Sequence, residues 1–121
     1  MKNLKLSQEQ LNQEISLKMN FNEAVEIKNS LDFLIAEADK KSIHKSLLDL
    51  NCFIMEEISN RIKNQNEKQD IVIKELFFHQ LIEAKNSLDL ALSDVGYIND
   101  FSPALSFSSK LMQKISNMMV D

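Results

Sequence analysis

Four segments of the chain carry apolar residues at alternating spacings of three and four, the pattern of a helix with one buried face. Little in the sequence would break such helices, because the chain contains one glycine and one proline. The pattern therefore predicts four amphipathic helices. Their apolar stripes are Ala24, Ile27, Leu31, Leu34, Ile35 and Ala38; Ile43, Leu47, Leu50, Ile54, Ile58 and Ile62; Leu81, Ala84, Leu88, Ala91, Leu92 and Val95; and Ala104, Phe107, Leu111, Ile115 and Met118.

Capping residues between these segments place the helix ends. We expect Ser42 to cap the second helix, Gly96 to end the third, and Ser102 with Pro103 to start the fourth. Connections this short place successive helices side by side and antiparallel. The sequence therefore predicts an all-α, up-down-up-down four-helix bundle that forms a single helical domain over residues 1–121.

The second half of the chain repeats the first at an offset of 57 residues. With residues 21–64 set over residues 78–121, 12 positions are identical. Amphipathic helices share apolar positions in any case, but a shared polar string in register is typical of a tandem duplication. We expect two copies of a helical hairpin, roughly 13–64 and 70–121, with Asp70 capping the third helix. In the first copy, the identical residues are Phe21, Glu26, Lys28, Asn29, Ser30, Leu31, Asp32, Leu48, Met55, Ile58, Ser59 and Asn60.

Residues 1–19 lie mostly outside the aligned repeat. Ser7 and Gln10 resemble a capping box that opens a helix through Leu11, Ile15 and Met19. This N-terminal segment could run into the first long helix, break near residue 20, or fold back over the bundle. We expect a continuous or kinked helical extension.

Two polar pairs recur at matched places in the two copies. Lys28 and Asp32 are four residues apart on one helix, as are Lys85 and Asp89, so each pair shares a helix face at the edge of the apolar stripe. They could be symmetry-related ligand sites. We favour structural ion pairs inherited from the ancestral hairpin, each contributing at most about 1 kcal/mol.

A second set of apolar positions falls outside the main stripes. A monomeric four-helix bundle needs one stripe per helix, so further matched apolar positions suggest a docking surface. In the alternative interpretation, the N-terminal extension covers this face within the same chain. The predicted partner-binding residues are Ile15, Met19 and Phe33, with Val72, Leu76 and Leu90 at the same offset.

Histidines are the natural candidates for a metal site. His79 lies four residues from both Glu75 and Glu83, so the three can share a helix face. The chain has no Glu-x-x-His motif, however, and the repeat gives neither His79 nor His44 a histidine counterpart. We therefore expect no metal and no cofactor.

Two further positions carry polar or reactive groups. Asn51 falls inside an apolar stripe, with Ser108 as its counterpart, and we expect this pair to fix helix register rather than to line a cavity. Cys52 projects away from the main stripe. Neither histidine is placed by the sequence to activate this thiol, so we expect no catalytic role.

Composition narrows the possible partners. The net charge of −4 disfavours nucleic-acid binding, which relies on a basic face. No apolar run approaches the roughly 20 residues of a membrane span. Cys52 is the chain's one cysteine, so no intramolecular disulfide can form, and we expect a cytoplasmic protein without a signal peptide.

These features favour a small, acidic, non-enzymatic protein-binding module that acts through helix surfaces, of the immunity, inhibitor, chaperone or antitoxin type. The alternative is a homo-oligomeric structural or regulatory bundle, such as a homodimer whose apolar faces meet. A second alternative is a small-ligand sensor that uses the bundle interior. The sequence has no glycine-rich phosphate loop and no catalytic grouping, so we expect no enzyme activity.

Overall fold

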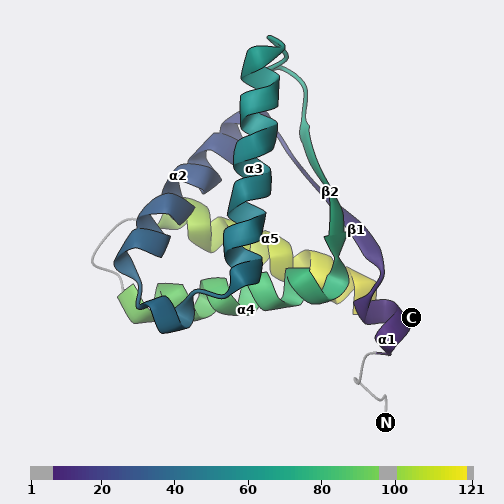
Figure 1. Cartoon of the computed structure of the whole chain (residues 1–121), viewed down its shortest axis with the longest axis vertical. Coiled ribbons are helices and arrows are strands. Elements are labelled where there is room, and N and C mark those ends of the chain that lie inside the picture. Colours follow the sequence, from purple (N-terminus) through teal and green to yellow (C-terminus); the bar gives the residue numbers. More distant parts are fainter. Residues whose placement is uncertain (1–6, 96–100, 120–121) are drawn as a thin grey trace.

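The structure, a computed structural model, describes residues 7–95 and 101–119 and is mostly helical (Figure 1). The same order of elements, a strand followed by two long helices, occurs in each half. The predicted end of the third helix at Gly96 lies outside the described residues. The elements are α1 (Gln8–Leu11), β1 (Glu14–Met19), α2 (Phe21–Glu37), the 3₁₀-helix η1 (Lys40–Ser42), α3 (Lys45–Lys63), β2 (Ile71–Phe77), α4 (Phe78–Val95) and α5 (Ser102–Met119).

The predicted helical extension is wrong, because the segment before α2 is a strand. The capping box of Ser7 and Gln10 forms, but α1 has one turn and β1 follows it. In β1 the side chains alternate between buried and exposed, with Ile15, Leu17 and Met19 inside. This period of two is the strand signature. Asp70 likewise precedes a strand rather than capping a helix.

The two strands pair with each other as an antiparallel ribbon. Met19 pairs with Ile71, and Ile15 pairs with Leu76. A register shift lies between Ile15 and Leu17. Ile15 and Leu17 are two residues apart, whereas their partners Leu76 and Ile73 are three apart, so β2 holds one extra residue, as in a β-bulge. Because of this extra residue, the offset of 57 does not align equivalent residues throughout the two strands.

Each long helix begins at an identifiable cap. The Oδ1 atom of Asn20 accepts a hydrogen bond from the backbone of Glu23 and starts α2. The N-cap of α3 is His44, two residues after the predicted Ser42, and its Nδ1 accepts from the backbone of Ser46. The fourth long helix begins at Ser102, one residue before the start at Pro103 that Ser102 as N-cap would give.

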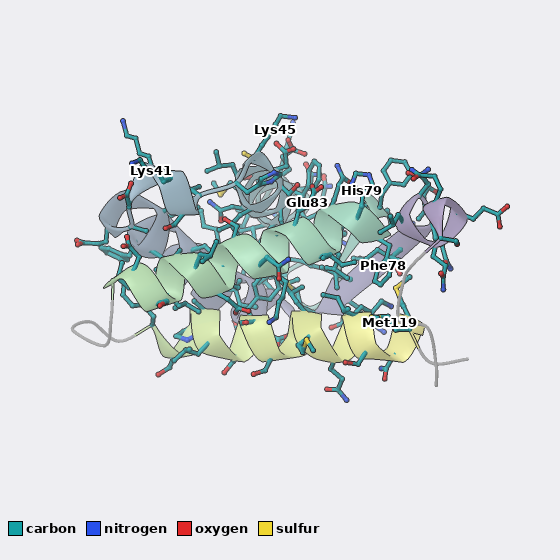
Figure 2. All side chains as sticks on the ribbon, turned by 90° about the horizontal axis from the view of Figure 1, so that it is seen from below. Lys41, Lys45, Phe78, His79, Glu83 and Met119 are labelled. Carbon is teal, nitrogen blue, oxygen red and sulfur yellow. The ribbon has the colours of Figure 1, made fainter. Side chains whose placement is uncertain are left out.

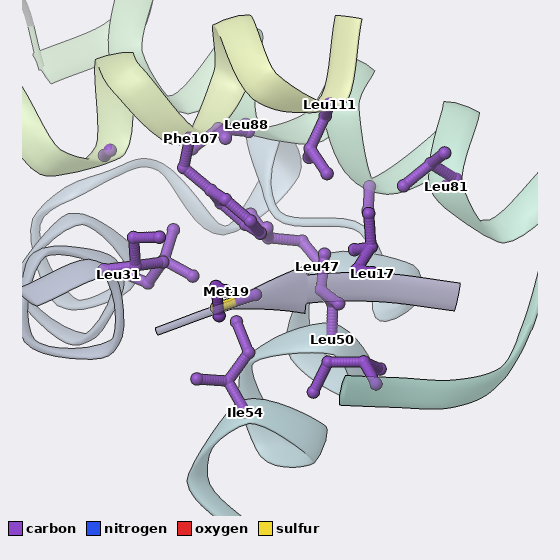
Figure 3. Packing of buried hydrophobic residues seen from close by; sticks show 14 of the residues in the cluster. Leu17, Met19, Leu31, Leu47, Leu50, Ile54, Leu81, Leu88, Phe107 and Leu111 are labelled. Carbon is purple, nitrogen blue, oxygen red and sulfur yellow. The ribbon is translucent and has the colours of Figure 1, made fainter. Parts of the chain in front are cut away.

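Both halves contribute to one hydrophobic core. α2 packs against α3 and α5, and α4 also packs against both of those helices, so the four form a closed ring around the core. Figure 3 shows Leu17 and Met19 of β1 among side chains from the long helices. Figure 1 shows α3 crossing α4 steeply, unlike the near-parallel helices of an up-down bundle. The prediction of a mostly helical fold is therefore confirmed, and four long helices surround one core.

Candidate binding surfaces on helices α3 and α5

Both predicted ion pairs form, and each continues into a hydrogen bond to the next helix. Lys28 pairs with Asp32 on α2, and Asn51 of α3 donates a hydrogen bond to the Asp32 carboxylate over 2.9 Å. Lys85 pairs with Asp89 on α4, and Ser108 of α5 donates to Asp89 over 2.6 Å. Asn51 and Ser108 thus occupy equivalent places, and each joins the two helices of its own half.

Electrostatics show why Asp32 stays charged in this network. Burial raises the pKa of Asp32, but hydrogen bonds from Lys28 and Asn51, together with the Lys28 charge, outweigh burial and hold the pKa below its ordinary value of 3.8. The Asp32 side chain remains 43% exposed, which limits the energy of the ion pair. The network forms a helix–helix clamp between α2 and α3.

The predicted partner-binding face does not form as one surface. Ile15, Met19 and Leu76 are buried in the core, because their segments are strands whose inward side chains pack beneath the helices. Val72 is partly buried and lies between the buried Ile71 and Ile73, so the alternation of the strand turns it to the other side of β2. Phe33 and Leu90 alone among the six are exposed.

Glu83 is on α4 and lies next to the start of α3, where the two halves of the chain meet. The hydroxyl of Ser46 donates to Glu83 Oε2 over 2.7 Å. This hydrogen bond lowers the pKa of Glu83 below its ordinary value of 4.5 against the opposing effect of burial, and the charges of His44 and His79 act in the same direction as the bond. Figure 2 shows Glu83 and His79 along one side of α4, and the ring of His79 stacks on that of Phe77.

Metal-ligating side chains do not gather in this structure. Within residues 7–95 and 101–119 no three His, Cys, Asp or Glu side chains are placed to hold a metal ion. Cys52 is exposed on α3. A groove of about 500 Å³ runs between the starts of α2 and α5, and the ion pair of Lys110 with Glu23, at 3.1 Å, lies on its wall.

On α3 and α5, exposed large apolar side chains recur at matched positions. Leu48 and Leu105 are 41% and 42% exposed, and Met55 and Met112 are 43% and 49% exposed. Because both the residue type and the exposure agree across the two halves, the same surface is present twice. Ile62, 53% exposed rather than in the core as predicted, continues the series on α3.

These residues form one narrow stripe on each helix. Leu48, Met55 and Ile62 are seven residues apart, and small residues at positions 52 and 59 lie between them. Spacings of four, three, four and three keep all five residues on one helix face, as in a coiled-coil seam. We name two surfaces by their residues: the α3 stripe is Leu48, Cys52, Met55, Ser59 and Ile62, and the α5 stripe is Leu105, Ser109, Met112 and Ser116. Met119, the counterpart of Ile62, is partly buried against the core.

The two stripes differ in what flanks them. Charged side chains border the α3 stripe: Lys45 and Asp49 form an ion pair at 3.4 Å, and Glu56 is exposed about two turns further on. On α5 no exposed residue carries a charge. The exposed residues of α5 are Ser102, Leu105, Ser106, Ser109, Met112, Gln113, Ser116 and Asn117.

The stripes are separate surfaces, because their helices lie on different sides of the molecule. In Figure 2, Lys45 at the start of α3 lies at the top and Met119 at the end of α5 lies near the bottom, with α4 between the two helices. Figure 1 correspondingly places α3 in front of α5. A partner that covers one stripe therefore leaves the other accessible.

Comparison with protein families, curated proteins and solved structures gave no match for this chain. No helix in the described part of the chain is long and apolar enough to cross a membrane. The stripes could have been found from sequence by asking which identities of the repeat fall outside the core pattern. Leu48, Met55 and Ser59 are identical in the two copies, yet none belongs to the predicted core of the second helix.

Proposed function

We propose that this chain is a non-enzymatic protein-binding module whose binding surfaces are the α3 stripe and the α5 stripe. The observation that carries the proposal is the pair of matched exposed residues Met55 and Met112, flanked by Leu48 and Leu105 at the same offset. Exposed apolar residues at random positions are common in proteins, but a contiguous patch of them marks an interaction site. Here the patch is retained in both halves.

We further propose that the chain is a tandem duplication of a strand–helix–helix unit. The repeated order of elements, the shared polar string and the two equivalent clamps, Asp32 with Asn51 and Asp89 with Ser108, support it. A pseudo-twofold relation between the halves explains why the strand of one half pairs with the equivalent strand of the other half. The duplication gives the module two versions of one surface with different charged borders.

The partner we propose for the α3 stripe is an amphipathic α-helix of another protein, in the cytoplasm. A seam with a 3.5-residue repeat presents knobs and holes that fit a helix better than a flat or extended segment. Charged residues beside an apolar centre are typical of interfaces between proteins that also exist apart. The border of Lys45, Asp49 and Glu56 would select among such helices by charge.

Site-specific photo-crosslinking in cells that make the protein tests this proposal. A photoreactive phenylalanine analogue replaces Met55, and the matched control carries it at Glu67, an exposed loop position. We expect a discrete adduct from position 55, which Leu48→Asp in the same chain abolishes, and none from position 67. The same adducts from both positions, or an adduct at position 55 that Leu48→Asp leaves intact, would contradict the proposal.

A further inference from the structure

We infer that a second copy of this chain docks on the α5 stripe, so that two α5 helices pack antiparallel about a twofold axis near positions 110 and 111. This inference rests on the proposed function, since it assigns an occupant to one of the two proposed surfaces. Three features of α5 point to a copy of itself rather than to a foreign partner: its charge, the sizes of its side chains, and its contrast with α3.

Charge is the first feature. Lys110 and Lys114 are the two charged residues of α5, and they lie five and nine residues after Leu105, on the side of the helix turned away from the stripe. Lys110 is also paired with Glu23 of α2. Two α5 stripes can therefore meet without removing a charge from water, which is the main cost of closing a polar interface. Depletion of charge is also the compositional mark of an interface centre.

Side-chain size is the second feature. Large and small residues alternate along the α5 stripe, from Leu105 and Ser109 to Met112 and Ser116. In the antiparallel register, Leu105 of one copy faces Ser116 of the other, and Ser109 faces Met112. Every layer then holds one large and one small side chain, so the packing is even. A parallel pair would instead place methionine against methionine and serine against serine, which crowds some layers and leaves gaps in others.

The α3 stripe provides the third argument, because it has the same alternation but the wrong border. In the equivalent antiparallel pair of α3 helices, Asp49 of one copy comes beside Glu56 of the other. Like charges at such positions are unfavourable and disfavour self-pairing. On α5 the corresponding residues are Ser106 and Gln113, which are uncharged. Self-association is therefore assigned to α5, and the α3 stripe remains free on the other side.

Sedimentation equilibrium on the purified full chain, from low micromolar to several hundred micromolar, gives the first test. We expect a monomer–dimer equilibrium for the wild type. Met112→Asp should shift it to monomer, weakening association at least tenfold, because two aspartates would be buried in one seam. Met55→Asp is the matched control, since it replaces the same residue at the equivalent place on α3, and it should leave the equilibrium unchanged. A wild type that stays monomeric throughout, or a dimer that is lost with Met55→Asp and not with Met112→Asp, overturns the inference.

Moving the cysteine gives the second test, because Cys52 and Ser109 are equivalent positions of the two stripes. In the variant Cys52→Ser/Ser109→Cys, the thiol lies near the proposed axis, and mild oxidation should produce a disulfide-linked dimer in high yield. The wild type, with its thiol on α3, should cross-link poorly, and adding Met112→Asp to the moved cysteine should abolish the product. Equal yields from both cysteine positions overturn the inference. The adduct from position 55 does not depend on α5, so failure here leaves the proposed function standing.

Discussion

Asn51 donates a hydrogen bond to the carboxylate of Asp32 across the interface between α3 and α2, over 2.9 Å. Asp32 also forms an ion pair with the ammonium group of Lys28 on its own helix, so two side chains hold the carboxylate. The second half of the chain repeats the arrangement with Ser108 in place of Asn51. A shorter side chain thus makes an equivalent bond, which shows that the carboxylate position is what the two halves have in common.

Removing this bond should cost stability without altering the fold. We expect Asn51→Ala to lower the free energy of unfolding by about 0.5–1.5 kcal/mol, the net contribution of one hydrogen bond, since Lys28 remains to compensate Asp32. Urea unfolding followed by circular dichroism measures the change. Asn60→Ala, at an exposed site on the same helix, is the control and should stay within about 0.5 kcal/mol of wild type. An Asn51→Ala chain as stable as the control would show that the clamp contributes nothing.

The hydrogen bond between Ser46 and Glu83 should make the free energy of unfolding depend on pH in the acidic range. A carboxyl group whose pKa is lower in the folded chain than in the unfolded chain stabilises the fold above its unfolded pKa, and this contribution is lost as pH falls through the folded pKa. Since the pKa of Glu83 lies below 4.5 in the fold, stability should decline on acidification below about this value.

Ser46→Ala isolates this effect, because the serine hydroxyl is the main cause of the lowered pKa. We expect the variant to be less stable than wild type by about 1 kcal/mol at pH 7, with the difference narrowing toward pH 3 as Glu83 becomes protonated in both chains. Unfolding free energies at a series of pH values check this. Ser59→Ala, exposed on the same helix, should show no such convergence. A Ser46→Ala deficit that is the same at every pH would mean that the hydroxyl does not act through Glu83.

The strand assignment leads to a prediction at Leu17, which the helical interpretation leaves off the apolar face. In β1 the Leu17 side chain is 2% exposed and packs among the core residues. Leu17→Ala should therefore cost about 2–5 kcal/mol through lost burial and the cavity left behind. Ser16→Ala, the exposed neighbour, is the control. Thermal unfolding of the two variants distinguishes strand from helix, because a small effect at Leu17 would contradict the buried position.

Leu17 and its neighbours also show why the strands could not be predicted from the sequence. Ile15 and Met19, four apart, satisfy a helical period, but with Leu17 they equally satisfy the alternation of a strand. A segment of six residues is too short for periodicity to decide between the two. The extra residue in β2 also made the strand pattern harder to recognise. Because of it, the offset of 57 aligns Ile15 with Val72, which is not a core residue. Long helices have enough repeats to escape this ambiguity, and their core faces were predicted well.

The candidate surfaces were harder to predict, because exposure depends on how helices cross. Leu48 and Met55 fall outside the apolar stripe predicted for this helix, but only the packing of α3 against α2 and α4 shows that no other described element covers them. Local pairs were easier, since Lys28 and Asp32 meet wherever their helix forms. Sequence alone thus predicts interactions within one helix, but it does not predict which side chains remain exposed once the helices cross.

Phe33 and Leu90 provide the sharpest test of where binding occurs. They are the most exposed large apolar residues described, at 68% and 59%, and the sequence predicted them as partner-binding. Yet Phe33 belongs to α2, and Leu90 of α4 lines a pocket with Ile43 and His44 at the start of α3, so neither is part of a stripe. We expect Phe33→Asp/Leu90→Asp to keep the fold, because exposed positions tolerate such changes within about 0.5 kcal/mol each.

The same double variant should leave both the α5-dependent dimer and the adduct from position 55 unchanged, whereas Leu48→Asp removes the adduct and Met112→Asp removes the dimer. Sedimentation and photo-crosslinking of the three variants, side by side, measure this directly. If the adduct from position 55 disappears in Phe33→Asp/Leu90→Asp while circular dichroism shows an intact fold, the partner contacts α2 and α4 as well. The α3 stripe would then be one part of a broader surface, and the separation of the two stripes into independent sites would have to be given up.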